Sequence, residues 1–170
     1  PQATIAPTVA AERLQQDGPF SIPIFARIAP ASPEELQQIL KGLPNSVNGL
    51  IVPVESLKLL AGWVAPLDLA EGSRPVLLAL DHQSWRDPQL QDQVLSLVQE
   101  GRLAGIVVVS ASENGAQTFG KPGLPRALET IVELRQKLGP KPLLIGSVGV
   151  HAPADGLDYF EAGADLVQVD

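Results

Sequence analysis

One pattern occurs three times in the chain, and this repeat limits the folds that are open to it. Residues 23–52, 75–108 and 142–169 each begin at a proline, continue as a short apolar run, pass through an amphipathic stretch and end in an apolar run led by a glycine. Short apolar runs bounded by Gly and Pro are typical of strands buried on both faces, and the stretches between them have hydrophobic residues at helical spacing. This alternation predicts right-handed crossovers and a parallel sheet.

Two architectures satisfy this alternation, an open doubly wound sheet and a barrel of eight βα units. A repeat that is itself one βαβ unit favours the barrel, although complete barrels need about 250 residues and this chain has 170. We therefore predict an α/β fold of the parallel, TIM-barrel-like type, with about six βα units in an incomplete or open barrel. Residues 1–20 are expected to form a surface segment or linker with one short helix near 9–16, and residues 21–170 to form the barrel domain. The start at Pro1 and the absence of Met suggest a fragment or excised domain.

Composition excludes several classes of function. The net charge is -7 and the 12 Lys and Arg residues are scattered, which argues against binding to nucleic-acid phosphates. Without Cys the chain has no disulfides, thiolate nucleophiles or Cys-ligated metals, and His82 and His151 do not form a metal-binding pair. No apolar run approaches the roughly 20 residues of a membrane span. We expect a cytoplasmic protein with a small-molecule ligand, acting with other domains of a longer chain or as a homo-oligomer.

Several helix boundaries can be read from local signals. Ser32 and Asp87 each precede a proline, and Ser32 with Glu35 matches a capping box. A third helix is expected over residues 124–138, after a long polar loop at 110–123 that is predicted to be functional or mobile. The apolar face of this third helix is expected to contain Leu128, Ile131 and Val132.

The turn at residues 146–149 is the first candidate for a ligand site. Gly146 and Gly149 stand where the apolar run 142–145 ends, and parallel sheets bind ligands at the carboxyl ends of their strands. A phosphate could lie on this turn, or the glycines could simply give the turn its backbone freedom. Asp81 and His82 also follow an apolar run and could serve acid and base chemistry. For Lys121, anion binding and a solvated side chain are equally compatible with the sequence.

The C-terminal stretch IGSVGVHAPADGLDYFEAGADLVQVD resembles the end of the barrel in the FMN-containing dihydroorotate dehydrogenases. The similarity extends upstream through the motif Phe-Gly-Lys-Pro at 119–122 and the run 105–110, and covers roughly residues 75–170. It implies a flavin oxidoreductase of pyrimidine biosynthesis, with the FMN phosphate over the turn at 146–149 and the isoalloxazine ring over the barrel mouth.

The resemblance also assigns cofactor-binding positions. Gly146 and Gly149 match glycines of the family, and Gly120 and Lys121 match the loop after the sixth barrel strand. Ser110 falls where the family has a substrate-binding Asn.

Other family positions carry different residues here. The lysine that contacts the flavin falls at Ala79, a further Gly falls at Val148, and an Asn of the fourth strand falls near Pro53. Asp170, an anion, stands where the family helps to hold the phosphate. Ser56 lies close to the position of the catalytic Ser in the quinone-linked class and is the candidate catalytic residue.

Three functional hypotheses follow. The first is a dihydroorotate-dehydrogenase-like barrel domain that binds FMN and, if active, is an FMN-dependent dehydrogenase. The second is a degenerate barrel, a pseudoenzyme that acts as an interaction or regulatory module, which the replaced Lys and Asn positions favour. The third is a phosphate-ligand barrel with lyase or isomerase chemistry that uses Asp81, His82 and Lys121.

Overall fold

The computed structural model divides the chain into two compact units, Pro1–Pro75 and Val76–Asp170. The helix expected near residues 9–16 lies outside the described part of the chain, as does Gly120. The residues that the structure describes are 23–30, 32–56, 74–110, 112–113, 116–117 and 121–169.

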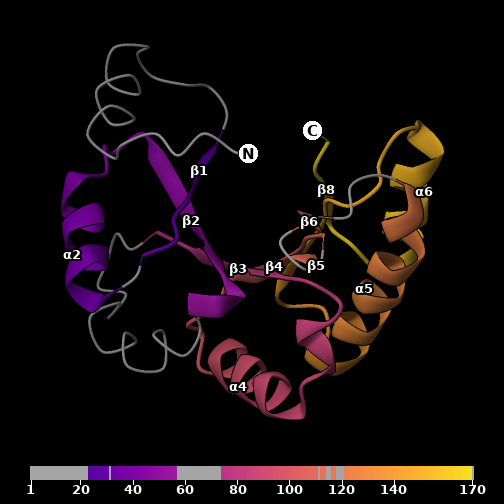
Figure 1. Ribbon diagram of the computed structural model, residues 1–170, viewed down its shortest axis with the longest axis horizontal. Coiled ribbons are helices and arrows are strands. Elements are labelled where there is room, and N and C mark those ends of the chain that lie inside the picture. Colours follow the sequence, from indigo (N-terminus) through magenta and orange to yellow (C-terminus); the bar gives the residue numbers. More distant parts are fainter. Residues whose placement is uncertain are drawn as a thin grey trace. The chain divides into compact units, whose positions relative to one another are not determined.

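The first unit contains one strand–helix–strand motif with parallel strands. Strand β1 (Ile24–Arg27) pairs in parallel with β2 (Val47–Pro53), and helix α2 (Pro33–Gly42) lies between them in sequence and beside them in space (Figure 1). The predicted cap is confirmed, because the Ser32 hydroxyl accepts a hydrogen bond from the Glu35 backbone N–H at 3.2 Å. Pro53 is the last residue of its strand, where a missing N–H is tolerated. A short 3-10 helix, η1 (Val54–Ser56), follows.

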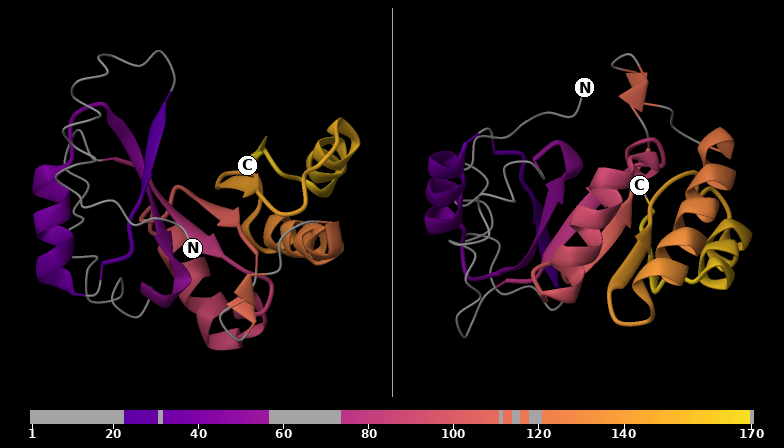
Figure 2. Two further views of the ribbon diagram at one scale, coloured as in Figure 1. Left: turned by 45° about the horizontal axis from the view of Figure 1, so that its top comes forward. Right: turned by 90° about the horizontal axis from the view of Figure 1, so that it is seen from below.

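The second unit is built on four parallel strands in the order β3, β4, β7, β8. Helices α4, α5 and α6 lie along one side of these strands (Figure 1), and the small hairpin of β5 and β6 projects away from the helices (Figure 2, right). The elements are β3 (Val76–Leu80), η2 (Ser84–Arg86), α4 (Pro88–Gln99), β4 (Gly105–Val108), β5 (Ser112–Glu113), β6 (Ala116–Gln117), η3 (Lys121–Gly123), α5 (Leu124–Leu138), β7 (Leu143–Gly146), α6 (Pro153–Ala162) and β8 (Leu166–Val167).

The core of the second unit follows from the apolar runs. Every residue of β3 and β4 is buried, as expected for parallel strands covered on both faces. The Asp87 carboxylate caps α4 by accepting from the Gln89 N–H at 2.9 Å. Fully buried side chains of this core include Leu77, Leu78, Leu80, Trp85, Ile106, Ile131, Leu134, Leu144 and Tyr159.

Three expectations need correction. The segment 110–123 is not an unstructured loop, since it contains the antiparallel pair β5–β6 and the turn η3. Val132 is 38% exposed, because α5 turns Leu124, Ala127, Thr130, Ile131 and Leu134 inward instead. The last strand is also shorter than the apolar run 166–169 suggested, and it ends at Val167.

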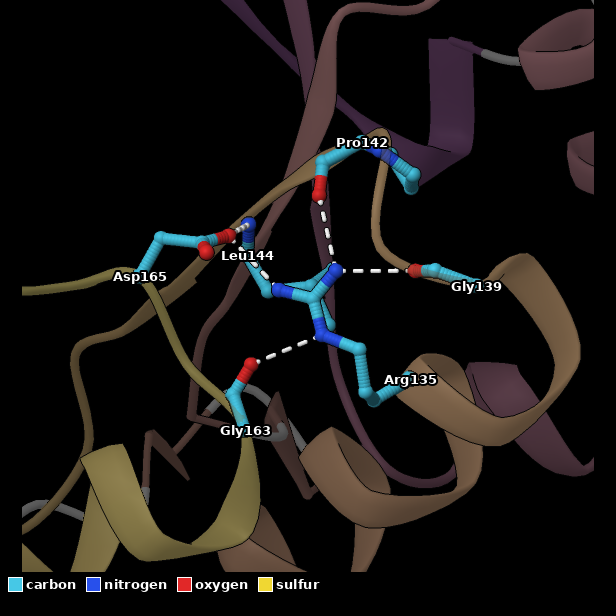
Figure 3. Close-up of polar contacts among 6 residues, drawn as sticks. All are labelled: Arg135, Gly139, Pro142, Leu144, Gly163 and Asp165. Atoms are coloured by element: carbon cyan, nitrogen blue, oxygen red, sulfur yellow. Dashed lines mark hydrogen bonds and ion pairs between the residues drawn. The ribbon is translucent and has the colours of Figure 1, made fainter.

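Arg135 of α5 joins several segments at the amino ends of β7 and β8 (Figure 3). Its guanidinium donates to the carbonyls of Gly139 at 2.8 Å, Pro142 at 3.2 Å and Gly163 at 2.9 Å, and pairs with the Asp165 carboxylate at 2.7 Å. Asp165 also accepts from the Leu144 N–H at 2.8 Å. One side chain therefore binds the loops before both strands, on the edge where barrel folds place stabilising rather than catalytic residues.

Candidate functional site

The candidate site is the edge of the second unit at which its parallel strands end. Asp81 and His82 follow β3, Ser110 follows β4, and the turn 147–150 follows β7. Because neighbouring parallel strands end at the same edge of a sheet, the sequence-predicted residues of this unit gather there. Ser110 is half-buried beside this edge.

The turn after β7 is fixed by hydrogen bonds to the rest of the unit. The Ser147 hydroxyl and backbone N–H both donate to the Val108 carbonyl, at 2.8 and 3.2 Å, which ties the turn to the end of β4. Gly149 is buried and has φ +72°, a conformation that residues with a Cβ rarely adopt. The positive φ explains one of the two predicted glycines.

Tyr159 of α6 supports the same turn from inside the unit and was not predicted from the sequence. Its hydroxyl donates to the Val148 carbonyl at 2.8 Å and accepts from the Val148 N–H at 3.2 Å. Its ring lies against Gly146, where an added Cβ would overlap the ring atoms. Burial raises the pKa of Tyr159 to about 12, while its hydrogen bond to the Val148 backbone acts in the lowering direction. Gly146 is thus required by packing.

The start of α6 already holds an anionic group. The buried Asp155 carboxylate accepts from the backbone N–H groups of His151 and Ala152, at 2.8 and 2.7 Å. These are amides that a helix start would otherwise offer to a bound anion. The imidazole of His151 is exposed.

Asp81 and His82 have separate surroundings. The Asp81 carboxylate accepts from the N–H groups of Gln83 and Ser84 and from the Ser84 hydroxyl, all within 2.9 Å, and so closes the turn that begins η2. His82 Nε2 instead lies 3.3 Å from an Arg126 guanidinium nitrogen on the first turn of α5. The two residues are therefore not arranged as an acid–base pair, and Arg126 was not singled out from the sequence.

The other predicted residues are placed only in part. Lys121 begins η3, directly before α5, so its backbone lies near the start of that helix. Ser56 ends η1 in the first unit. Within the described ranges no group of three His, Cys, Asp or Glu side chains could hold a metal ion. In the same residues, no helix combines the length and apolar character needed to cross a membrane.

Comparison with known proteins indicates the family. No protein-family model matches the chain. The quinone-type dihydroorotate dehydrogenase of Thermus thermophilus is 30% identical over 177 residues, which cover 96% of this chain and 38% of that protein. The corresponding enzyme of Christiangramia forsetii is 33% identical over 107 residues, covering 56% of this chain and 31% of the relative. The chain is a divergent, partial match to the dihydroorotate dehydrogenase family.

Solved structures agree on the fold. The dihydroorotate dehydrogenase of Eimeria tenella, crystallised with ferulenol, has a TM-score of 0.71 and 11% identity, and the match covers 96% of this chain and 56% of that chain. The predicted parallel, TIM-barrel-like α/β class is confirmed. The chain spans about a third of the length of the curated dihydroorotate dehydrogenases that it matches.

The dihydroorotate dehydrogenase register gives Ala79 a definite environment. Ala79 is 2% exposed within the wholly buried β3, at the position where the resemblance implies a flavin-contacting lysine. In the repeat, Arg27 occupies the equivalent place, since Arg27 and Ala79 are the fourth residues after Pro23 and Pro75. Arg27 is exposed at the end of β1.

Proposed function

We propose that this chain is a dihydroorotate-dehydrogenase-like barrel segment that binds no FMN and serves as an interaction or regulatory module. The observation that carries the proposal is the buried, apolar Ala79 in β3. A cation beside a flavin stabilises its reduced, anionic form, and an alanine in a wholly apolar strand provides no such charge. The strand position at which the resemblance implies a flavin-contacting lysine therefore carries no positive charge.

The phosphate end supports the same proposal. The Val148 N–H is directed at Tyr159, and the His151 and Ala152 N–H groups are directed at Asp155. A phosphate would have to displace a buried hydroxyl or compete with a buried carboxylate to use these donors. Both exchanges cost hydrogen bonds that the fold already makes.

Flavin uptake tests the proposal directly. We expect the purified chain, incubated with excess FMN and passed through a gel-filtration column, to elute without visible flavin absorbance and with an unchanged melting temperature. It should also reduce no quinone when dihydroorotate and FMN are supplied. Flavin that co-elutes with the protein in a fixed ratio would overturn the proposal.

A second candidate is an FMN-dependent dehydrogenase of the dihydroorotate dehydrogenase type, and the observation that favours it is the 30% identity to the quinone-type enzyme of Thermus thermophilus over 96% of this chain. If this candidate is right, the purified chain should retain FMN in a fixed ratio through gel filtration.

A further inference from the structure

Helix α6 has apolar residues on two opposite faces. Tyr159 and Asp155 face the interior of the second unit, whereas Leu157 is 62% exposed and Phe160 is 50% exposed. The two exposed residues are three positions apart and therefore lie on one side of the helix, together with the exposed Pro153. Leu157 and Phe160 therefore form an exposed apolar stripe on the side of α6 that faces away from the core of the second unit.

Acidic residues border the same face. Asp158 and Glu161, also three positions apart, lie along one flank of the stripe formed by Leu157 and Phe160. Neither carboxylate pairs with a cation in the described part of the chain, and α6 contains no Lys or Arg. The face therefore combines an apolar stripe with a one-sided acidic border.

We propose that the outer face of α6 (Pro153, Leu157, Phe160, with the border Asp158 and Glu161) docks a basic amphipathic helix of another protein. Such a helix would cover Leu157 and Phe160 with its apolar stripe and align Lys or Arg with the two carboxylates. A second copy of this chain is a poorer occupant, because it would bring the same acidic border and a net charge of -7 to the contact. The inference rests on the proposed role as an interaction module.

The test uses two synthetic peptides and the whole chain. One peptide has leucines at i, i+3, i+4 and i+7 with lysines beside them, and the other has glutamates in place of the lysines. We expect the lysine peptide to bind with an affinity that falls as salt is added, and the glutamate peptide not to bind. Phe160→Ala should weaken binding by at least about tenfold, as loss of an aromatic anchor does. Val132→Ala, at an exposed apolar residue of α5, should leave binding unchanged.

Charge reversal separates this site from general attraction to an acidic protein. The double variant Asp158→Lys, Glu161→Lys should bind the glutamate peptide and should no longer bind the lysine peptide. The proposal would be overturned if the affinity for the lysine peptide were the same in the wild type, in Phe160→Ala and in the charge-reversal variant. A wild-type dimer that Phe160→Ala dissociates would also overturn it, since a second copy would then be the occupant. FMN uptake would refute the proposed function without deciding whether α6 binds a peptide. Peptide binding is measured separately, so the two proposals can fail independently.

Discussion

At the scale of single residues, the contact between Tyr159 and the turn after β7 explains most of what the candidate site looks like. The phenol ring requires a glycine at 146, and the hydroxyl satisfies both backbone groups of Val148. A turn that resembles a ligand cradle in sequence is thereby held mainly by contacts within the protein.

Replacing Gly146 with Ala tests the packing. The new methyl group would overlap the Tyr159 ring, so we expect a loss of about 1–3 kcal/mol in the free energy of unfolding. Gly156→Ala in α6 is the matched control, because an added Cβ there meets nothing within 4 Å and a helical Gly→Ala change should stabilise by about 0.5–1 kcal/mol. Urea unfolding of both variants gives the comparison. Equal stabilities would show that the ring moves aside without cost.

The titration of Tyr159 predicts an alkaline loss of stability. Its folded pKa is raised to about 12 from 10.0, so the folded state keeps its proton where the unfolded state loses it. The stabilisation is complete below pH 10 and is lost as the pH rises towards 12, by up to roughly 2–3 kcal/mol. Unfolding free energies measured between pH 9 and 12 should fall more steeply for the wild type than for Tyr159→Phe. Parallel curves would contradict a raised pKa.

At the scale of elements, each unit uses an arginine to bind the loop that leads into a strand. Arg74 donates to the carbonyls of Leu43, Pro44 and Val47 in the first unit, as Arg135 does to three carbonyls in the second. The planar guanidinium can serve several acceptors at once, which a lysine cannot. These contacts fix where the helices end and the strands begin.

Removal of the Arg135 side chain should therefore destabilise the second unit strongly. Arg135→Ala leaves three carbonyls without this donor and removes the ion pair with Asp165, which keeps its hydrogen bond from the Leu144 N–H. We expect a loss of about 3 kcal/mol, roughly 1 kcal/mol for each carbonyl, with Arg135→Lys restoring only part of it. Arg102→Ala, which breaks an exposed pair with Glu100, should cost less than about 1 kcal/mol. Thermal unfolding of the three variants measures the difference, and similar costs for Arg135→Ala and Arg102→Ala would refute the role given to Arg135.

At the scale of the whole molecule, the spacing of hydrophobic residues and the positions of Gly, Pro and helix-capping residues predicted the fold class and most elements correctly. The Ser32 and Asp87 caps and the bounds of α5 follow from local chemistry, so a single sequence reveals them. The inward face of α5 and the hairpin β5–β6 depend on which neighbours a segment meets, and that information is not local. The same limit applies to the site, because no spacing rule connects Tyr159 to Val148 or His82 to Arg126.

The two hydrogen bonds between Tyr159 and Val148 also make the hydrogen exchange of the Val148 amide a measure of local opening. The Val148 amide can exchange its hydrogen with solvent only when the phenol leaves its position under the turn, and that departure breaks both hydrogen bonds together. The exchange rate of this one amide should therefore report how often α6 separates from the end of β7. A partner that binds the outer face of α6 would slow the exchange of the Val148 amide without contacting the turn.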